Sequence, residues 1–229
     1  MEKIITFNNV YANYSDGIAL SDISFDINVG EMVFIMGPTG AGKSSVLRAI
    51  YKDLNISSGN IFFEDTDITN IKRNKVSFFR RKIGMIFQDF KLLNDRTVFE
   101  NVALPLIIEG FGKNDIADNV NDVLSRVGLS TKSNSYPLNL SGGEQQRVSI
   151  ARAIVKHPKL ILADEPTGNL DPNIAHEIVD LLEDAIKLGS SVIMSTHNYE
   201  LIKNRKKRFI ELEEGKQVNW YVNKIYIYY

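Results

Sequence analysis

Residues 32–50 read MVFIMGPTGAGKSSVLRAI, and this stretch decides the fold. The apolar run Met32–Met36 is typical of a buried strand, and the apolar residues after Ser45 recur at helical spacing. Between them, residues 37–44 fit the pattern G-x-x-x-x-G-K-[ST], which carries meaning only with a strand before it and a helix after it. The stretch therefore predicts a strand, a phosphate-binding loop and a helix, rather than a chance glycine-rich turn.

The residue types of this loop explain what it can bind. Glycines let backbone N–H groups turn inward around phosphate oxygens, and the start of the next helix adds partial positive charge. Lys43 would supply a point charge to the β- and γ-phosphates of ATP, and Ser44 a hydroxyl to Mg²⁺. The residues expected to bind the nucleotide here are Gly37, Pro38, Thr39, Gly40, Ala41, Gly42, Lys43, Ser44 and Ser45.

The remaining chain continues an α/β pattern. Short apolar runs alternate with segments of helical periodicity, which favours a largely parallel sheet. These runs are 83–87, 160–163, 191–194 and 209–212. Residues 4–10 and 24–29 alternate instead, 60–64 could join them in a small antiparallel sheet, and 88–141 is mainly helical in pattern. The sequence predicts a RecA-like P-loop NTPase core with an N-terminal antiparallel β-subdomain and an inserted α-helical subdomain.

A second motif follows the predicted strand 160–163, where LILADE ends in two adjacent carboxylates. Ligands of open α/β sheets bind at the carboxyl ends of the strands. Asp164 would hold Mg²⁺, mostly through water, and Glu165 would polarise the attacking water as general base. Alone, such a pair is usually a solvated turn; beside a phosphate loop it predicts a hydrolytic site.

A third motif, LSGGEQQR at 140–147, opens another helical run. It provides a second helix N-terminus suited to anions. Two such helix starts in one chain could serve a single nucleotide only if the second acted in trans. We therefore expect a two-fold homodimer with two ATP molecules at its interface, each touched by Lys43 of one chain and by Ser141, Gly142, Gly143 and Glu144 of the other.

Composition restricts the classes of function. The 229 residues include 27 basic and 28 acidic ones, a balance that argues against nucleic acid as a partner. The absence of cysteine excludes disulfides, thiolate metal sites and cysteine nucleophiles. No stretch approaches the ~20 apolar residues that span a bilayer. We expect a cytoplasmic protein that another chain holds at the membrane.

The combined motifs resemble the ATPase subunit of ABC transporters. The likeness rests on LSGGE, the Asp-Glu pair and a late lone histidine, all in one chain with the phosphate loop. It covers residues 1–218 as a single ABC ATPase domain, with a helical subdomain at about 89–147. Residues 219–229 form an aromatic tail without a family match, expected to be poorly ordered.

The resemblance implies further roles for single residues. Tyr14 matches the aromatic that stacks on adenine, with Tyr11 as the alternative. Gln88 matches the glutamine that reaches Mg²⁺ and the water and couples to the membrane partner. Asp171 matches the loop that crosses the dimer axis, and His197 matches the switch histidine at the γ-phosphate. Glu144 departs from the commoner glutamine but is familiar in one branch of the family.

Two stretches point to that branch. DEPTGNLD at 164–171 resembles cell-division, lipoprotein-release and macrolide-efflux ATPases, which transmit force across a membrane. NDRT at 94–97 favours the cell-division branch, FtsE, whose implied partner is an FtsX-like membrane protein that regulates cell-wall hydrolysis. The other two systems are the alternative. Rivals of other classes are a soluble ABC protein acting on DNA or ribosomes, and an ATP-binding scaffold without turnover.

One feature outside the motifs is the basic run Lys203–Arg208. Most such runs are solvated faces, and a contact with anionic lipid headgroups is the sharper interpretation. His157 and His176 match no motif and are expected at the surface.

Overall fold

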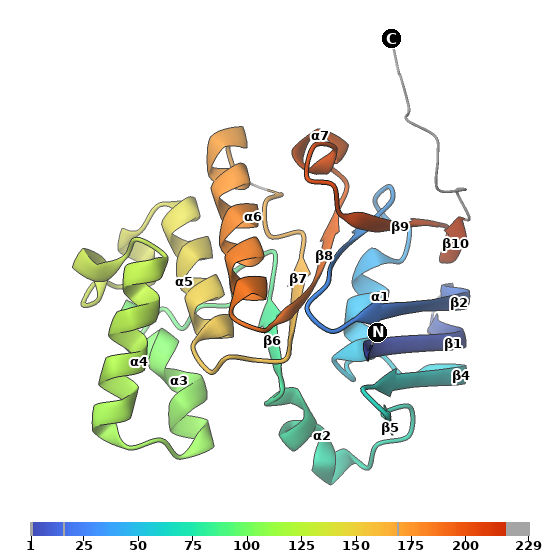
Figure 1. Ribbon diagram of the computed structural model, residues 1–229, viewed down its shortest axis with the longest axis horizontal. Helices are drawn as coiled ribbons and strands as arrows, with labels where there is room; N and C mark the ends of the chain where they lie inside the picture. The colour runs from blue at the N-terminus through green and yellow to red at the C-terminus, as the bar shows by residue number, and fades with distance from the viewer. Residues whose placement is uncertain (1, 16, 169, 219–229) are drawn as a thin grey trace.

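The computed structural model describes residues 2–15, 17–168 and 170–218. A six-stranded sheet forms its centre, in the order β10-β9-β3-β8-β7-β6 (Figure 1). Its members are β3 (Met32–Met36), β6 (Ile83–Ile86), β7 (Leu160–Asp164), β8 (Ser191–Thr196), β9 (Arg208–Glu213) and β10 (Lys216–Val218). Every pairing is parallel except that of β9 with β10. All six residues of β8 are buried, as expected of a strand covered on both faces.

A second sheet is antiparallel, in the order β2-β1-β4-β5. It comprises β1 (Lys3–Tyr14), β2 (Gly17–Asn28), β4 (Ile56–Phe63) and β5 (Thr66–Asp67). Along β1, buried and exposed positions alternate in part, so that one face packs on the core and the other meets solvent.

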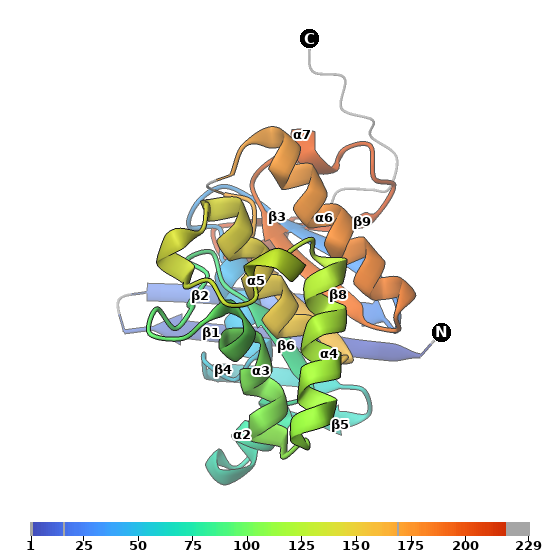
Figure 2. The same ribbon diagram turned by 90° about the vertical axis from the view of Figure 1, so that its left-hand side faces the viewer.

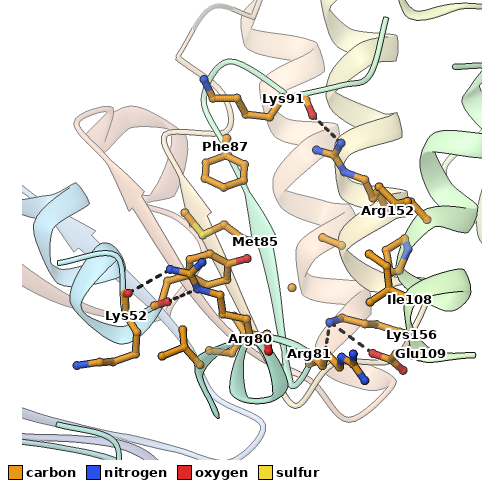
Figure 3. Close-up of a pocket in the computed structure, with 18 of the residues that line it drawn as sticks. Lys52, Arg80, Arg81, Met85, Phe87, Lys91, Ile108, Glu109, Arg152 and Lys156 are labelled. Carbon is orange, nitrogen blue, oxygen red and sulfur yellow. Dashed lines mark hydrogen bonds and ion pairs between the residues drawn. The ribbon is translucent and has the colours of Figure 1, made fainter. Parts of the chain in front are cut away.

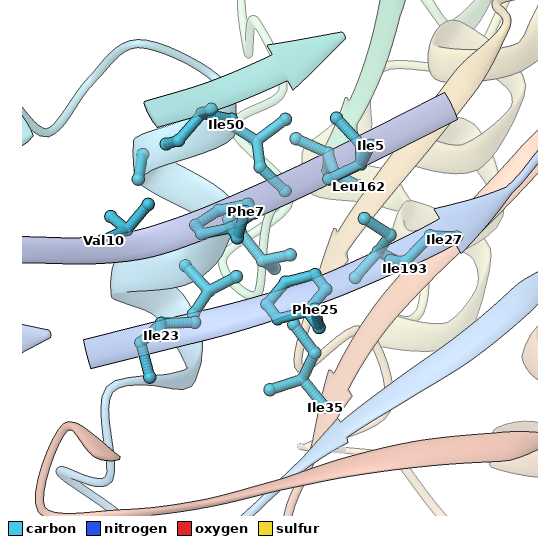
Figure 4. Packing of buried hydrophobic residues seen from close by; sticks show 14 of the residues in the cluster. Ile5, Phe7, Val10, Ile23, Phe25, Ile27, Ile35, Ile50, Leu162 and Ile193 are labelled. Atoms are coloured by element: carbon cyan, nitrogen blue, oxygen red, sulfur yellow. The ribbon is translucent and has the colours of Figure 1, made fainter. Parts of the chain in front are cut away.

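Helix α1 (Lys43–Ile50) packs between the two sheets, and the largest apolar cluster surrounds it (Figure 4). Phe7 of β1 stacks on Phe25 of β2 with ring centroids 4.6 Å apart. Ile50 of α1 lies in the same cluster as Leu162 of β7. This packing fixes α1, and with it the loop before α1, against the parallel sheet.

The helices lie mainly to one side of the parallel sheet (Figures 1 and 2). They are α3 (Val98–Glu109), α4 (Lys113–Arg126), α5 (Gly142–Ile154) and α6 (Pro172–Lys187), with short 3₁₀ turns at Ser130–Lys132 and Pro137–Asn139. Helix α7 (Tyr199–Ile202) follows β8, and α2 (Arg73–Arg80) precedes β6 and packs Phe79 into the cluster between the two sheets. Helix α5 contacts α3 and α4, and also β6 and α6. It therefore joins the helical region to the sheet. That residues 89–147 form a separate subdomain stays a prediction.

The fold class predicted from the sequence is confirmed: a parallel core, an N-terminal antiparallel sheet and an inserted helical region are all present. No helix within residues 2–218, as far as they are described, is both long and apolar enough to cross a membrane. The predicted tail at 219–229 lies outside the described residues.

Most residues of the basic run Lys203–Arg208 are exposed, as expected of a solvated face, but several of its cations form ion pairs. Arg205 is largely buried and pairs with Asp180 at 2.7 Å and with Glu183 at 3.1 Å. Arg208 pairs with Glu31 at 2.7 Å. These cations hold β9 and the segment after α7 to α6 and to the turn before β3, and are therefore a structural element rather than a free charged face.

Asn101 of α3 fixes the loop that precedes this helix. Its side chain is fully buried; the amide donates to the carbonyls of Leu93, Arg96 and Thr97, and its oxygen accepts from the Leu93 N–H at 2.8 Å. The loop contains the NDRT stretch that distinguishes the family branches. A buried asparagine thus sets the backbone between Gln88 and α3.

Asn101→Ala is expected to lower the free energy of unfolding by about 2–3 kcal/mol, because it leaves buried backbone groups without partners. Thermal unfolding followed by circular dichroism would measure the change. Asn119→Ala is the matched control, since Asn119 is only half-buried on α4 and makes one side-chain bond, to the Asp115 carbonyl. Equal losses in both variants would contradict the role given to Asn101.

Candidate functional site

Three parallel strands end at one edge of the sheet and position the residues of the predicted site there. The phosphate loop follows β3, Asp164 and Glu165 end or follow β7, and His197 follows β8. Strands β3 and β7 both pair with β8 in parallel, so their carboxyl ends lie side by side. Open α/β sheets bind ligands at this edge.

Lys43 lies almost fully buried inside its own loop, with 4% of its side chain exposed. Its ammonium donates to the carbonyls of Gly37 at 2.8 Å and Pro38 at 3.0 Å, and pairs with Glu165 Oε1 at 3.1 Å. At Gly37, φ is +147°, and a Cβ there would lie 2.2 Å from the Leu212 carbonyl oxygen of β9. Only glycine lets the loop pass β9 at this distance.

Ser44 and Asp164 form a small oxygen cluster beside this lysine. The Ser44 hydroxyl donates to Asp164 Oδ1 at 2.9 Å, and Ser195 of β8 donates to the same oxygen at 2.7 Å. A hydroxyl and a carboxylate are oxygen donors of the kind that Mg²⁺ takes, usually with one or two carboxylates and the rest from phosphate and water. The residues therefore fit the predicted metal.

Glu165 is held from several sides in a left-handed conformation, with φ at +43°. Its backbone N–H donates to Ser195 Oγ at 2.8 Å. One carboxylate oxygen pairs with Lys43, and the other lies 3.0 Å from Nδ1 of His197. A non-glycine residue at positive φ is uncommon, and here these bonds compensate its cost.

Gln88 reaches the same place from the loop after β6. A Cβ added to Gly168 would lie 3.5 Å from Gln88 Nε2 and 3.7 Å from Glu165 Oε2. Both side chains thus flank Gly168. The structure brings together Lys43, Glu165, His197 and Gln88, which the sequence assigned to one reaction centre.

The second predicted anion-binding helix start makes no bonded contact with the first among the described residues. Ser141 caps α5 in a reciprocal capping box with Glu144, and no hydrogen bond or ion pair among the described residues joins them to the phosphate loop. The Ser141 N–H bonded to its carboxylate lowers the pKa of Glu144 most, and Lys132 lies 3.4 Å away. A Cβ on Gly143 would lie 2.9 Å from Ile174 of α6, so close helix packing requires a glycine there.

Tyr14 and Asp171 lie at the margins of the site. The Tyr14 hydroxyl is 3.2 Å from Ser45 Oγ and accepts from Arg48 at 3.2 Å, which ties the half-exposed ring to α1. Tyr11 is equally exposed. Asp171 is exposed at the start of α6 and its side chain makes no capping bond.

Sequence reasoning gave no role to Ser195. Its hydroxyl donates to Asp164 Oδ1 and accepts from the Glu165 N–H, so it aligns both carboxylates. In the sequence, Ser195 could have been noticed as a hydroxyl residue at the end of a buried strand. That strand pairs with the one that carries the Asp-Glu pair.

A large groove of about 1180 Å³ lies between β6, α2 and α3, and the sequence did not reveal it (Figure 3). Phe87, Met85 and Ile108 contribute apolar surface, and cations surround them. The lining cations are Lys52, Arg73, Arg80, Arg81, Lys91, Arg152 and Lys156, and the single lining acid is Glu109. Several cations are bonded to backbone carbonyls rather than acids; Arg152, for example, donates to Phe90 and Lys91.

Burial in this wall lowers the pKa of Lys156 and of Arg152. Lys156 pairs with Glu109 at 3.7 Å and also donates to the Arg81 carbonyl. The groove therefore carries net positive charge close to apolar surface. Phe87, at its upper end in Figure 3, directly precedes Gln88 of the site.

Comparison with known proteins gives a consistent result. Residues 20–168 match the family model described as ABC transporter. The chain is 46% identical to "Cell division ATP-binding protein FtsE" of Bacillus subtilis (strain 168), with 93% of each chain covered. It is 47% identical to the protein of the same name from Escherichia coli (strain K12), covering 93% of this chain and 96% of that one.

A solved structure extends the likeness to the fold. It is titled a dimeric post-hydrolysis state of the ATP-binding cassette MJ0796 bound to ADP and Pi. It matches with a TM-score of 0.86 and 33% identity, over 94% of this chain and 97% of that chain. Together with the site described above, these likenesses identify the chain as a nucleotide-binding, ATP-hydrolysing member of the ABC transporter family that belongs to its FtsE cell-division branch.

Proposed function

We propose that two copies of this chain enclose two ATP and Mg²⁺ and drive an FtsX-like membrane protein in cell division and in the regulation of cell-wall hydrolysis. The observation that carries the proposal is the position of Glu165, held between Lys43 and His197 with Gln88 nearby. We assign Glu165 as the carboxylate base, Lys43 as the phosphate-binding cation and His197 as the contact to the γ-phosphate.

Each residue of the site then has its own role in hydrolysis. Lys43 neutralises phosphate charge, and the backbone N–H groups of the loop orient the phosphate oxygens. Glu165 takes a proton from the attacking water as general base, and His197 steadies the γ-phosphate. Gln88 orients the water and couples the site to the membrane partner in the groove. Tyr14 stacks on the adenine, and Asp171 faces the second chain at the dimer axis.

Mg²⁺ would be held by Ser44, Asp164 and, through its amide oxygen, Gln88. The two hydroxyls on Asp164 Oδ1 align its carboxylate for this task. When bound, the ion supplies positive charge that stabilises the phosphate oxygens during hydrolysis.

The absence of a bonded contact between the two helix starts, among the described residues, supports the dimer. Ser141–Gly143 begins α5, has no bonded contact with the phosphate loop among the described residues, and is therefore supplied to the partner's nucleotide. A two-fold axis completes both sites at once. The dimeric cassette with ADP and Pi supports this arrangement.

The groove is the surface we assign to the membrane partner. It combines apolar residues such as Ile108, 55% exposed, with a continuous path through Phe87 to Gln88 and the site. An inserted partner helix would contact both walls, so that movement of the helical region is transmitted through α3. The 46% and 47% identities favour the cell-division system over lipoprotein-release or macrolide-efflux systems.

Glu165→Gln is expected to lower the rate of ATP hydrolysis roughly 100- to 1,000-fold, as loss of one preorganised catalytic group typically does. ATP binding should persist, and the ATP-bound dimer should accumulate in size-exclusion chromatography. Phosphate release would be compared with that of Glu177→Gln, an exposed acid of α6. Unchanged turnover in Glu165→Gln would refute the base assignment.

The trans site can be tested by mixing two inactive variants. Lys43→Ala removes the phosphate cation, and Ser141→Arg blocks the second helix start. In an equal mixture, half of the dimers are mixed and each has one intact site, so activity should recover to about a quarter of wild type if sites act independently. No recovery, with mixed dimers verified by cross-linking, would contradict composite sites.

Partner binding can be tested by capture from gently solubilised native membranes with the Glu165→Gln protein, followed by mass spectrometry. An FtsX-like protein is expected. Ile108→Glu should lose it, because the carboxylate is placed in an apolar part of the groove. Ile107→Glu is the matched control, since Ile107 is equally exposed on α3 but does not line the groove.

Capture of a lipoprotein-release or efflux permease would overturn the cell-division assignment and leave the site intact. Recovery of no membrane protein, with turnover stimulated by nucleic acid, would favour the soluble rival instead. A dimer that binds ATP but never hydrolyses it, even with its partner, would favour the scaffold.

A further inference from the structure

One short helix and its flanks carry a run of cations that, in the part of the chain the structure describes, mostly lack ion pairs. Between Ile68 and Phe87 there are six basic residues and no acid. They are Lys72, Arg73, Lys75, Arg80, Arg81 and Lys82. Apart from Arg80, which lies 3.8 Å from Asp53, none forms an ion pair with any described residue. Most other clusters of cations are paired, as the run Lys203–Arg208 illustrates.

Helix α2 is anchored on one side and open on the other. Phe79 is buried and meets Phe63 edge-on, with ring centroids 5.4 Å apart. Arg80 donates to the carbonyls of Tyr51 and Lys52 at the end of α1. The helix is therefore held rigidly in place by the core and not by its outward residues.

The outward face combines cations with an exposed aromatic ring. Lys72 and Lys75 are exposed, and Phe78 is 62% exposed with the Arg81 guanidinium 4.8 Å from its ring centroid. Lys82, just after the helix, is also exposed, and its ammonium lies at the edge of this surface, 5.9 Å from the ring centroid of Phe63. A basic amphipathic helix with a projecting aromatic residue is the pattern of a segment that lies on an anionic membrane surface.

The position of α2 fits such a contact. It directly precedes β6, and so lies at the amino end of the parallel strands, opposite the edge that carries Asp164 and His197 (Figure 1). Arg73, Arg80 and Arg81 also line the groove assigned to the membrane partner. A membrane protein seated in that groove would bring the outward face of α2 towards the bilayer without obstructing the nucleotide.

We propose that the exposed surface of α2 and its flanks, formed by Lys72, Lys75, Phe78 and Lys82, binds anionic phospholipid headgroups directly. The contact is a second attachment to the membrane, independent of the protein partner. It is electrostatic in the main, with Phe78 entering the interface between headgroups and acyl chains. This proposal goes beyond the proposed function and does not depend on which permease fills the groove.

The test is co-sedimentation of the purified full-length chain with vesicles at low and moderate salt. Vesicles rich in phosphatidylglycerol should bind the chain, and phosphatidylcholine vesicles should not. Salt should weaken the binding, because charges at a surface are screened beyond a Debye length of about 10 Å at 0.1 M. No binding to the anionic vesicles, or equal binding to both kinds, would overturn the proposal.

Two triple variants separate a specific face from net charge. Lys72→Gln/Lys75→Gln/Lys82→Gln should lower the partition coefficient roughly a hundredfold, since each basic residue near the surface contributes about fivefold. The control Lys113→Gln/Lys206→Gln/Lys216→Gln removes the same charge from exposed positions without described ion pairs. Equal losses in the two variants would refute a site on α2.

Two further readouts keep folding and partner effects apart. Basal ATP hydrolysis of both triple variants should match that of the wild type, and Phe78→Ser should weaken vesicle binding without changing hydrolysis. If the α2 triple variant binds anionic vesicles normally but no longer captures the membrane partner, these cations meet protein rather than lipid, and the proposal is wrong.

Discussion

The buried ammonium of Lys43 is the constraint on which the site depends. Taking a charge out of water costs several kcal/mol unless paired groups compensate it. Here the carbonyls of Gly37 and Pro38 and the carboxylate of Glu165 provide that compensation. The loop must therefore curl back on itself, which glycine permits at Gly37, and β7 must end beside β3. The loop before α1 and the carboxylate of Glu165 are thus parts of one electrostatic arrangement.

A near-zero net charge conceals how unevenly this chain places its charges. With 27 basic and 28 acidic residues, the composition argues against nucleic acid as a partner. The structure pairs many cations with acids, including four of the six residues in Lys203–Arg208. It leaves most cations of α2 and its flanks, and several of the groove, without an ion pair among the described residues. Composition limits the total charge but not its distribution, and the distribution decides which partners a surface attracts.

Local sequence was sufficient where the chemistry is local. The phosphate loop, the Asp-Glu pair and the strands around them follow from short patterns, because each needs only neighbours in the chain. Ser195, Asn101 and the groove could not be predicted in this way. Ser195 acts on Asp164 only because β8 lies beside β7, and Asn101 is buried only because its loop folds over α3. Arg152 and Lys91 become neighbours only when α5 packs against the loop after β6.

The end of β6 is where the groove and the nucleotide site meet. Phe87 lines the groove, and the next residue, Gln88, lies beside Gly168 and Glu165. Arg152 of α5 holds the carbonyls of Phe90 and Lys91, so the helix that begins with Ser141 also fixes the far side of this loop. A displacement of α5 relative to the sheet must therefore move the loop that carries Gln88, since its backbone is bonded to that helix. Two sites at opposite faces of the loop are joined by a few bonded residues, which is the physical requirement for coupling between them.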